Sequence, residues 1–390
     1  MAVERKKICV VTGTRAEYGI LYWLLRRLQA SGATQLHIVA TGMHLSPEFG
    51  LTYRTIEENG FVIDEKVEML LSGDTSASVS KSMGLAMISF PDAYERLRPD
   101  WVVILGDRYE IFAAATAAYM MKIPIAHIGG GETTEGAVDE AIRHAISKMA
   151  NLHFVSTETY RRRVIQLGES PERVFNTGAL GLDHLKRTAL LSRRELEAAL
   201  DFQLGETNFI VTYHPATLGE DADEGFIALL NALRRFPQAR VVFTYPNSDA
   251  GGRGIIEAID AFAEACASRC KAFTSLGQQR YLSALQHFDV VIGNSSSAII
   301  EAPSFGIPAV NIGERQRGRV RAASVIDCAA NEAAIAAAIE QALSADFRAL
   351  AKNADNPYEG SGDAAGMICE ILSSAESPAT GKKFYDIEVA

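Results

Sequence analysis

The sequence predicts an α/β protein of two Rossmann-like, doubly wound domains that face a cleft. Short apolar runs rich in β-branched residues alternate with longer helical patterns, and this alternation begins afresh in the second half of the chain. Strands that are apolar throughout and separated by helices are typical of a parallel sheet covered on both faces. The length of 390 residues also suits two domains better than one.

Six apolar runs are the expected strands of the first domain, and helical patterns separate them. The most apolar helical pattern, Ile111–Met121, should be a buried helix, because it is about half as long as a membrane-spanning helix must be. The expected strands are Ile8–Val11, His37–Ala40, Trp101–Leu105, Pro124–Ile128, His153–Ser156 and Val174–Gly178.

Five further runs are the expected strands of the second domain, with helices at Gly225–Arg235 and Gly254–Cys270 between them. We expect an N-terminal domain over residues 1–182 and a second domain over 183–363, which opens on a polar, helix-prone stretch. A C-terminal helix and a polar, frayed tail should occupy 364–390. The second set of strands is Phe209–Thr212, Val241–Thr244, Ala272–Thr274, Val290–Gly293 and Ala309–Ile312.

Charge and cysteine content exclude several classes of protein. Lys and Arg total 38 against 48 Asp and Glu, a formal net charge of −10, which argues against a nucleic-acid binder. The five cysteines lack zinc-type spacing, so a reduced, cytoplasmic compartment is expected. The apolar run after the basic N-terminus is too short for a signal peptide, and no run is long enough to cross a membrane.

Candidate functional residues follow the strands, where open α/β sheets bind their ligands. Thr12–Gly19 comes directly after the first strand, and its glycine permits a tight turn before a helix whose N–H groups could hold an anion. Arg15 adds a planar donor fork suited to phosphate. A plain strand–helix turn with a solvated Arg15 is an equally good interpretation of these residues alone.

Two carboxylates stand at neighbouring strand ends of the first domain, and a third lies on the next helix. Asp107 follows one strand, Glu132 follows the glycines 129–131 after the next, and Asp139 begins a helix. Grouped carboxylates suit acid–base chemistry, because close charges push their pKa values apart. Taken singly, Asp107 could cap a helix, and Asp139 could form a surface ion pair with Arg143.

The second domain carries polar residues at two strand ends. His214 follows the first strand, and Asn294, Ser295 and Ser296 open a helix after another, where N–H and O–H groups could bind phosphate. Glu301 should lie one to two turns into that helix, where it could accept both hydroxyls of a ribose. Arg315 belongs to a local basic cluster that could neutralise a diphosphate or be a solvated loop.

Together these motifs resemble the hydrolysing UDP-N-acetylglucosamine 2-epimerases of bacterial sialic acid biosynthesis. The likeness spans nearly the whole chain and keeps the family order, which makes it highly specific. The matching stretches are TGTRAEYG (12–19), TGMHLSPEFG (41–50), LGDRYEIF (105–112), GGGE (129–132), DEAIRHAISKM (139–149), VIQLGESPERVFNTGALG (164–181), YHP (213–215), GNSSSAIIEAPS (293–304) and NIGERQRGRVRAASVID (311–327).

The resemblance implies a glycosyltransferase B fold and a reaction on UDP-N-acetylglucosamine. The C2 proton and UDP leave to give a 2-acetamidoglucal, and water then adds to give N-acetylmannosamine. The resemblance implies no metal or nicotinamide cofactor, and it implies a homo-oligomer, either a dimer or a tetramer. By position, the acid–base groups would be Asp107, Glu132 and Asp139, with His214 near the diphosphate; Arg15, Ser295, Ser296 and Glu301 would contact the nucleotide.

One position departs from the related non-hydrolysing epimerases, which carry Glu where this chain has Gly129, so Glu132 is the candidate to replace it. Three alternatives remain open. The substrate could be a UDP-linked 2,4-diacetamido-6-deoxyhexose of a legionaminic-type pathway. The chain could also be a UDP-sugar glycosyltransferase or a non-catalytic nucleotide-sugar sensor, although neither would need grouped carboxylates.

Overall fold

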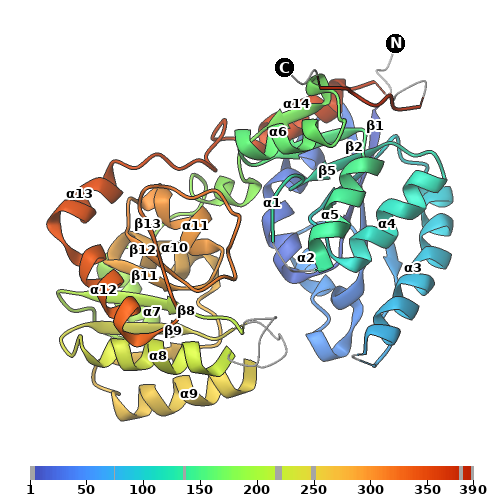
Figure 1. Cartoon of the computed structure of the whole chain (residues 1–390). Helices are drawn as coiled ribbons and strands as arrows, with labels where there is room; N and C mark the ends of the chain where they lie inside the picture. The colour runs from blue at the N-terminus through green and yellow to red at the C-terminus, as the bar shows by residue number, and fades with distance from the viewer. Residues whose placement is uncertain are drawn as a thin grey trace. The chain divides into compact units, whose positions relative to one another are not determined.

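The computed structural model describes residues 5–73, 75–134, 138–215, 222–246, 252–376 and 381–387. The chain divides into two compact units (Figure 1). The first comprises Met1–Thr133, Ala137–His184 and Tyr358–Ala390, and Leu185–Pro357 forms the body of the second. The division therefore falls after His184 rather than after residue 182, and the C-terminal residues join the first unit.

The first unit is built on a seven-stranded parallel sheet with the order β3-β2-β1-β4-β5-β6-β7. The strand order reverses between β1 and β4, so their carboxyl ends lie at a topological switch point. The strands are β1 (Lys6–Thr12), β2 (Thr34–Thr41), β3 (Glu65–Val67), β4 (Trp101–Leu105), β5 (Ile125–Ile128), β6 (Leu152–Val155) and β7 (Val174–Asn176).

Helices cover both faces of this sheet, as the uniformly apolar strands predict. Side chains of α1 and α14 pack with Ile8 and Val10 on one face, and side chains of α3, α4 and α5 pack with Cys9 and Val11 on the other. The helices are α1 (Arg15–Ala30), α2 (Tyr53–Glu58), α3 (Ser76–Leu97), α4 (Tyr109–Met120), α5 (Val138–Met149), α6 (Glu158–Gln166) and α14 (Ala364–Ser374).

The second unit repeats this architecture on a six-stranded parallel sheet with the order β10-β9-β8-β11-β12-β13. Helices α8, α9 and α12 pack on one face, and α7, α10 and α11 pack on the other. Its strands are β8 (Asn208–Thr212), β9 (Arg240–Thr244), β10 (Cys270–Phe273), β11 (Val290–Gly293), β12 (Ala309–Ile312) and β13 (Val325–Cys328). Its helices are α7 (Arg193–Leu200), α8 (Ala222–Arg234), α9 (Gly252–Ala265), α10 (Gly277–His287), α11 (Ser297–Ile300), α12 (Glu332–Leu343) and α13 (Ala345–Lys352).

The predicted fold class, two doubly wound α/β domains, is confirmed, and all eleven expected strands are present. Two strands were not anticipated. β3 (Glu65–Val67) has only three residues, two of them charged, and β13 (Val325–Cys328) is at most partly buried. Edge strands of this kind lack the continuous apolar run by which a buried strand is recognised.

The C-terminal helix belongs to the first unit because its first turn is capped from there. The carboxylate of Asp183 accepts hydrogen bonds from the backbone N–H groups of Ala364 at 2.9 Å and Ala365 at 2.8 Å. The expected fraying of the tail does not hold for residues 381–387. There the N–H of Tyr385 donates to the carbonyl of Gly168 at 2.9 Å, and Phe384 packs on Gly168.

Within the described residues, every helix is too short or too polar to traverse a lipid bilayer.

Candidate functional site

The first unit gathers three predicted carboxylates at the carboxyl ends of β4 and β5 and the start of α5. Arg143, only 3% exposed, forms hydrogen bonds to two of these three residues, Asp107 and Glu132. Its guanidinium donates to the carboxylate of Asp107, to the carbonyl of Glu132 at 2.8 Å and to the carboxylate of Glu140 at 2.8 Å. Three side-chain or backbone acceptors from three chain segments therefore converge on one buried cation.

Asp107 does not cap a helix. The residue at the N-cap of α4 is Arg108, whose side chain makes no capping hydrogen bond. The Asp107 side chain is instead paired with Arg143 and is 20% exposed. The sequence motif therefore positions a carboxylate at the sheet edge and leaves part of it accessible.

Asp139 lies in the first turn of α5, and the charge of Asp107 affects its pKa. Loss of hydration around its carboxyl raises its pKa, and the negative charge of Asp107 raises it further, while Arg108 and Arg143 oppose the rise. A carboxyl group of raised pKa beside an ion-paired carboxylate suits paired acid and base catalysis.

Glu132 follows the glycine turn after β5. Its carboxylate accepts a hydrogen bond from the hydroxyl of Ser156 at 3.3 Å. The glycines before it serve packing: Gly131 has φ +76°, and a Cβ there would overlap the carbonyl oxygen of Tyr160 on α6. At Gly131 the close approach is thus made by a helix of the same unit.

The turn after β1 is already occupied by a side chain. The carboxylate of Glu17 accepts from the backbone N–H groups of Gly13 at 2.8 Å and Thr14 at 3.2 Å, and Thr14 caps α1 in return. This reciprocal capping box consumes N–H groups that the sequence suggested for an anion. Arg15, the first residue of α1, has an exposed side chain.

His127 supports the site, and sequence reasoning missed it. Its buried ring bonds to the carbonyl of Gly106 at 2.8 Å and to the hydroxyl of Ser147 on α5 at 3.2 Å. Burial lowers its pKa to about 3, so the ring is neutral and links the loop before Asp107 to α5. A histidine inside the otherwise apolar strand β5 was the available signal.

In the second unit, Asn294 fixes the backbone of His214. Its side-chain amide accepts from the N–H of His214 at 2.7 Å and donates to the carbonyl of His214 at 2.8 Å. The carbonyl of Asn294 in turn accepts from Arg315 at 3.2 Å and from Gln316 at 2.9 Å. The three predicted residues His214, Asn294 and Arg315 therefore form one hydrogen-bonded group, to which the buried Gln316 adds a fourth member that the sequence did not reveal.

Ser295, Ser296 and Glu301 lie close by, but the expected helix is much shorter than predicted. α11 spans only Ser297–Ile300, and Glu301 is its C-cap rather than a residue one to two turns inside. Pro303 explains this, since a proline lacks an N–H and clashes with the preceding helical turn.

Ser297, which was not singled out, holds Glu301 in place. Its hydroxyl donates to the Glu301 carboxylate and also contacts the hydroxyl of Tyr281. Burial raises the pKa of Glu301, and the hydrogen bond from Ser297 opposes this rise.

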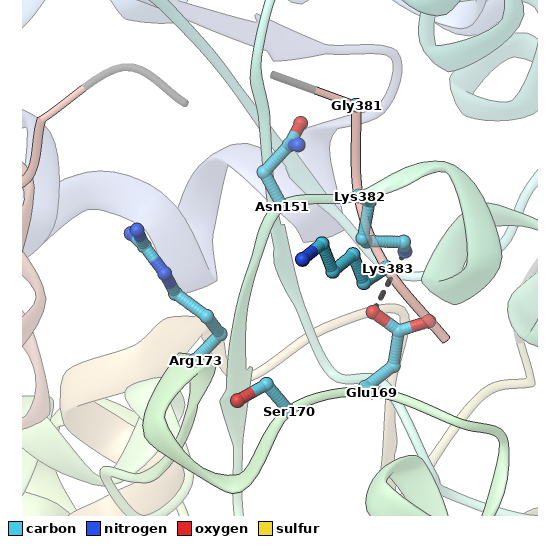
Figure 2. A pocket seen from close by; sticks show the side chains of 7 residues that line it. All are labelled: Asn151, Glu169, Ser170, Arg173, Gly381, Lys382 and Lys383. Atoms are coloured by element: carbon cyan, nitrogen blue, oxygen red, sulfur yellow. Dashed lines mark ion pairs between the residues drawn. The ribbon is translucent and has the colours of Figure 1, made fainter. Parts of the chain in front are cut away.

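A separate pocket lies at the amino end of β6, among side chains that include none of the predicted site residues (Figure 2). Its lining residues are Asn151, Glu169, Ser170, Arg173, Gly381, Lys382 and Lys383. In the described parts of the chain, no three His, Cys, Asp or Glu side chains come together as metal ligands would.

Comparisons with known proteins agree with this architecture. The profile of the family described as UDP-N-acetylglucosamine 2-epimerase matches residues 26–373. A Campylobacter jejuni protein, GDP/UDP-N,N'-diacetylbacillosamine 2-epimerase (hydrolyzing), is 44% identical over 89% of this chain and 90% of its own length. The polysialic acid biosynthesis protein P7 of Escherichia coli is 38% identical over 98% of both chains.

The solved structures extend the likeness to the fold. The Methanocaldococcus jannaschii UDP-GlcNAc 2-epimerase, solved in complex with UDP-GlcNAc and UDP, superimposes with a TM-score of 0.76 at 19% identity, covering 95% of this chain and 100% of that one. At this identity the match speaks for the fold alone. The family profile covers most of the chain, and the two relatives exceed 30% identity over nearly its whole length. The chain belongs to the UDP-N-acetylglucosamine 2-epimerase family.

Proposed function

We propose that this protein is a hydrolysing UDP-sugar 2-epimerase that inverts C2 of a UDP-linked 2-acetamido sugar and releases the sugar from UDP. The observation that carries the proposal is the carboxylate group around Arg143, in which Asp139 has a raised pKa beside the paired Asp107. A binding module or a simple sugar transferase would have no use for a carboxyl group of raised pKa beside a second, ion-paired carboxylate. Family membership supports the same activity.

The reaction needs a base and a good leaving group at the same time. A sugar C2–H has no adjacent ketone, so its removal must accompany departure of the anomeric UDP. Protein groups that donate hydrogen bonds to the diphosphate stabilise the negative charge that develops on it, and a positioned carboxylate takes the proton. The bonds to hydrogen at C2 and to oxygen at C1 break, and the product is a 2-acetamidoglucal.

In the second step, water adds to C1 of this glycal, and C2 takes a proton on the face opposite the one from which the first proton left. A carboxyl group that binds its proton more tightly than usual is suited to this delivery, and the raised pKa of Asp139 supports that role for it. Asp107 and Glu132 are then the candidate bases for the first step.

We assign UDP binding to the polar group of the second unit. His214, Asn294 and Arg315 offer ring, amide and guanidinium donors for the diphosphate. Ser295 and Ser296 would add further donors. Arg15 of the first unit stays a candidate phosphate contact by likeness to the family. The carboxylate of Glu301, oriented by Ser297, would accept hydrogen bonds from the two ribose hydroxyls.

The leading candidate substrate is UDP-N,N'-diacetylbacillosamine, because the relative at 44% identity bears that sugar in its name. UDP-N-acetylglucosamine, which the sequence motifs favoured, is the second candidate. It is supported by the family description and by the relative named for polysialic acid biosynthesis. The two sugars differ in the 4-acetamido and 6-deoxy groups, so one assay can decide between them.

The deciding experiment incubates the protein with each UDP sugar in D₂O, without an acceptor, and reads the products by NMR. We expect UDP, an inverted free sugar and one deuterium at C2, with the higher kcat/KM on the diacetylated sugar. Retention of the C2 hydrogen would disprove the elimination. Release of UDP only after addition of an acceptor would favour a glycosyltransferase.

By likeness to its family we also expect a cytoplasmic homo-oligomer, either a dimer or a tetramer. Light scattering of the purified protein at working concentration measures this directly. A monomer would contradict the expectation without touching the proposed reaction.

A further inference from the structure

Two carboxyl groups are buried side by side beneath the first unit's site, and the reaction described above uses neither. Glu17 on α1 is 8% exposed and Glu110 on α4 is 0% exposed. Both touch Gly13: Glu17 accepts from its N–H at 2.8 Å, and a Cβ on Gly13 would stand 2.6 Å from Cγ of Glu110. Glycine at position 13 is therefore required by the approach of Glu110.

Of these two carboxyl groups, Glu110 is the one that forms an ion pair within the described residues. Its Oε1 lies 2.7 Å from Nε of Arg108, whose side chain is 42% exposed. Burial and the negative charge of Glu110 raise the pKa of Glu17 to about 8, although the hydrogen bonds from Gly13 and Thr14 and the charge of Arg108 oppose the rise. Because a buried carboxylate is costly unless it is paired, the ion pair with Arg108 stabilises Glu110 in this buried position.

Arg108 lies near the candidate acid–base group. It directly follows Asp107 in the chain, and its positive charge lowers the pKa of Asp139. Its Nη2 lies 3.8 Å from the sulfur of Met43. The Nε of the guanidinium is thus bound by the buried Glu110, while the Arg108 side chain remains partly exposed to solvent at the carboxyl edge of the sheet.

We propose that Glu110 is a positioning residue for the reaction: its buried carboxylate fixes the Arg108 guanidinium at the sheet edge, where Arg108 meets an anionic group of the UDP sugar. Glu110 itself is fully buried and cannot touch a ligand. A long arginine side chain loses rotamer freedom when it binds, and an anchor that orders it beforehand removes that cost from the binding step. This inference rests on the proposed function.

The test is a double-mutant cycle in the full chain. Arg108→Gln should lower kcat/KM about tenfold or more, as expected for loss of a charged hydrogen bond. Glu110→Gln should lower it several-fold in the wild-type background, mainly through KM, and should have no further effect in the Arg108→Gln background. Glu110→Asp, which keeps the charge, should retain more kcat/KM than Glu110→Gln.

Glu17→Gln is the matched control, because it changes the other buried carboxyl on Gly13 without altering the ion pair to Arg108. Its kcat/KM at pH 7 should stay close to wild type. Equal losses from Glu110→Gln in both backgrounds would overturn the proposal, since Glu110 would then act on the fold rather than through Arg108. A wild-type kcat/KM for Glu110→Gln would overturn it as well.

A second readout does not depend on turnover. Phenylglyoxal modifies accessible guanidinium groups, and mass spectrometry of the peptide carrying Arg108 follows its rate. We expect Glu110→Gln to speed this modification several-fold and Glu17→Gln to leave it unchanged. If the wild-type protein hydrolyses no UDP sugar, the proposed function fails, but the modification rate still decides whether Glu110 holds Arg108; equal rates in wild type and Glu110→Gln would overturn that claim.

Discussion

Arg143 of α5 donates a hydrogen bond to the carboxylate of Asp107, which follows β4, and so binds a helix to the edge of the sheet it covers. The same guanidinium holds the carbonyl of Glu132 at 2.8 Å. Two segments far apart in sequence are thereby placed around a buried cation. The geometry of the candidate acid–base group depends on this one side chain.

Removal of Arg143 should destabilise the first unit strongly. Arg143→Met leaves the carboxylates of Asp107 and Glu140 without their buried partner, and the free energy of unfolding should fall by about 3 kcal/mol. Urea unfolding measures this. The control is Arg96→Met, which breaks the exposed ion pair with Glu65 and should cost less than about 1 kcal/mol. Equal losses would show that Arg143 is no more important than a surface arginine.

Asp107→Asn should abolish turnover and leave the affinity for UDP nearly unchanged. The change removes a carboxylate from the first unit's acid–base group, whereas the proposed UDP contacts lie mainly in the second unit. A loss of at least about a hundredfold in kcat is expected for an acid–base group. Calorimetric titration with UDP gives the affinity, and a large drop in that affinity would reassign Asp107 to binding.

Glu17→Gln should change how stability depends on pH. The pKa of Glu17 is raised to about 8 in the folded protein from its ordinary value of 4.5. The folded state therefore keeps a proton that the unfolded state releases, so this group makes stability fall as pH rises between these values. The variant lacks this contribution, so its free energy of unfolding, measured with urea, should rise relative to that of the wild type from pH 5 to pH 8. A difference independent of pH would contradict the raised pKa.

Lys382 should contribute stability through the pocket of Figure 2. Its ammonium donates to the carbonyls of Lys148 at 2.7 Å and Ala150 at 2.8 Å, and it pairs with Glu169 at 2.7 Å. Although burial alone would raise the pKa of Glu169, hydrogen bonds from His153, Lys148 and Lys382 lower it to about 2.

Lys382→Met should therefore lower the free energy of unfolding by about 1–3 kcal/mol. Lys383→Met, the same substitution at the neighbouring exposed lysine, is the control and should have little effect. Thermal and urea unfolding of the two variants give the comparison. If both variants behave alike, the C-terminal segment is not held by Lys382.

Much of the fold could be predicted because buried strands are recognised in the sequence as apolar runs. All eleven expected strands are present, and Ile111–Met121 nearly coincides with α4 (Tyr109–Met120). β3 (Glu65–Val67) could not be predicted, because it is short and two of its three residues are charged. α11 is shorter than the sequence indicates, because the serines before it resemble a helix start and Pro303 interrupts the helix that follows.

The sequence by itself determined which polar residues follow the strands, at the strand ends or on the next helix. They are Asp107, Glu132 and Asp139 in one unit, and His214, Asn294 and Glu301 in the other. Periodicity reveals strands and motifs reveal their ends, since both are local properties of the chain. Only the tertiary structure decided that Asp107 pairs with Arg143 rather than capping α4, that Glu17 fills the turn after β1, and that Glu110 holds Arg108. Partners for buried charges come from distant segments, and no local pattern records which of several candidates burial will bring together.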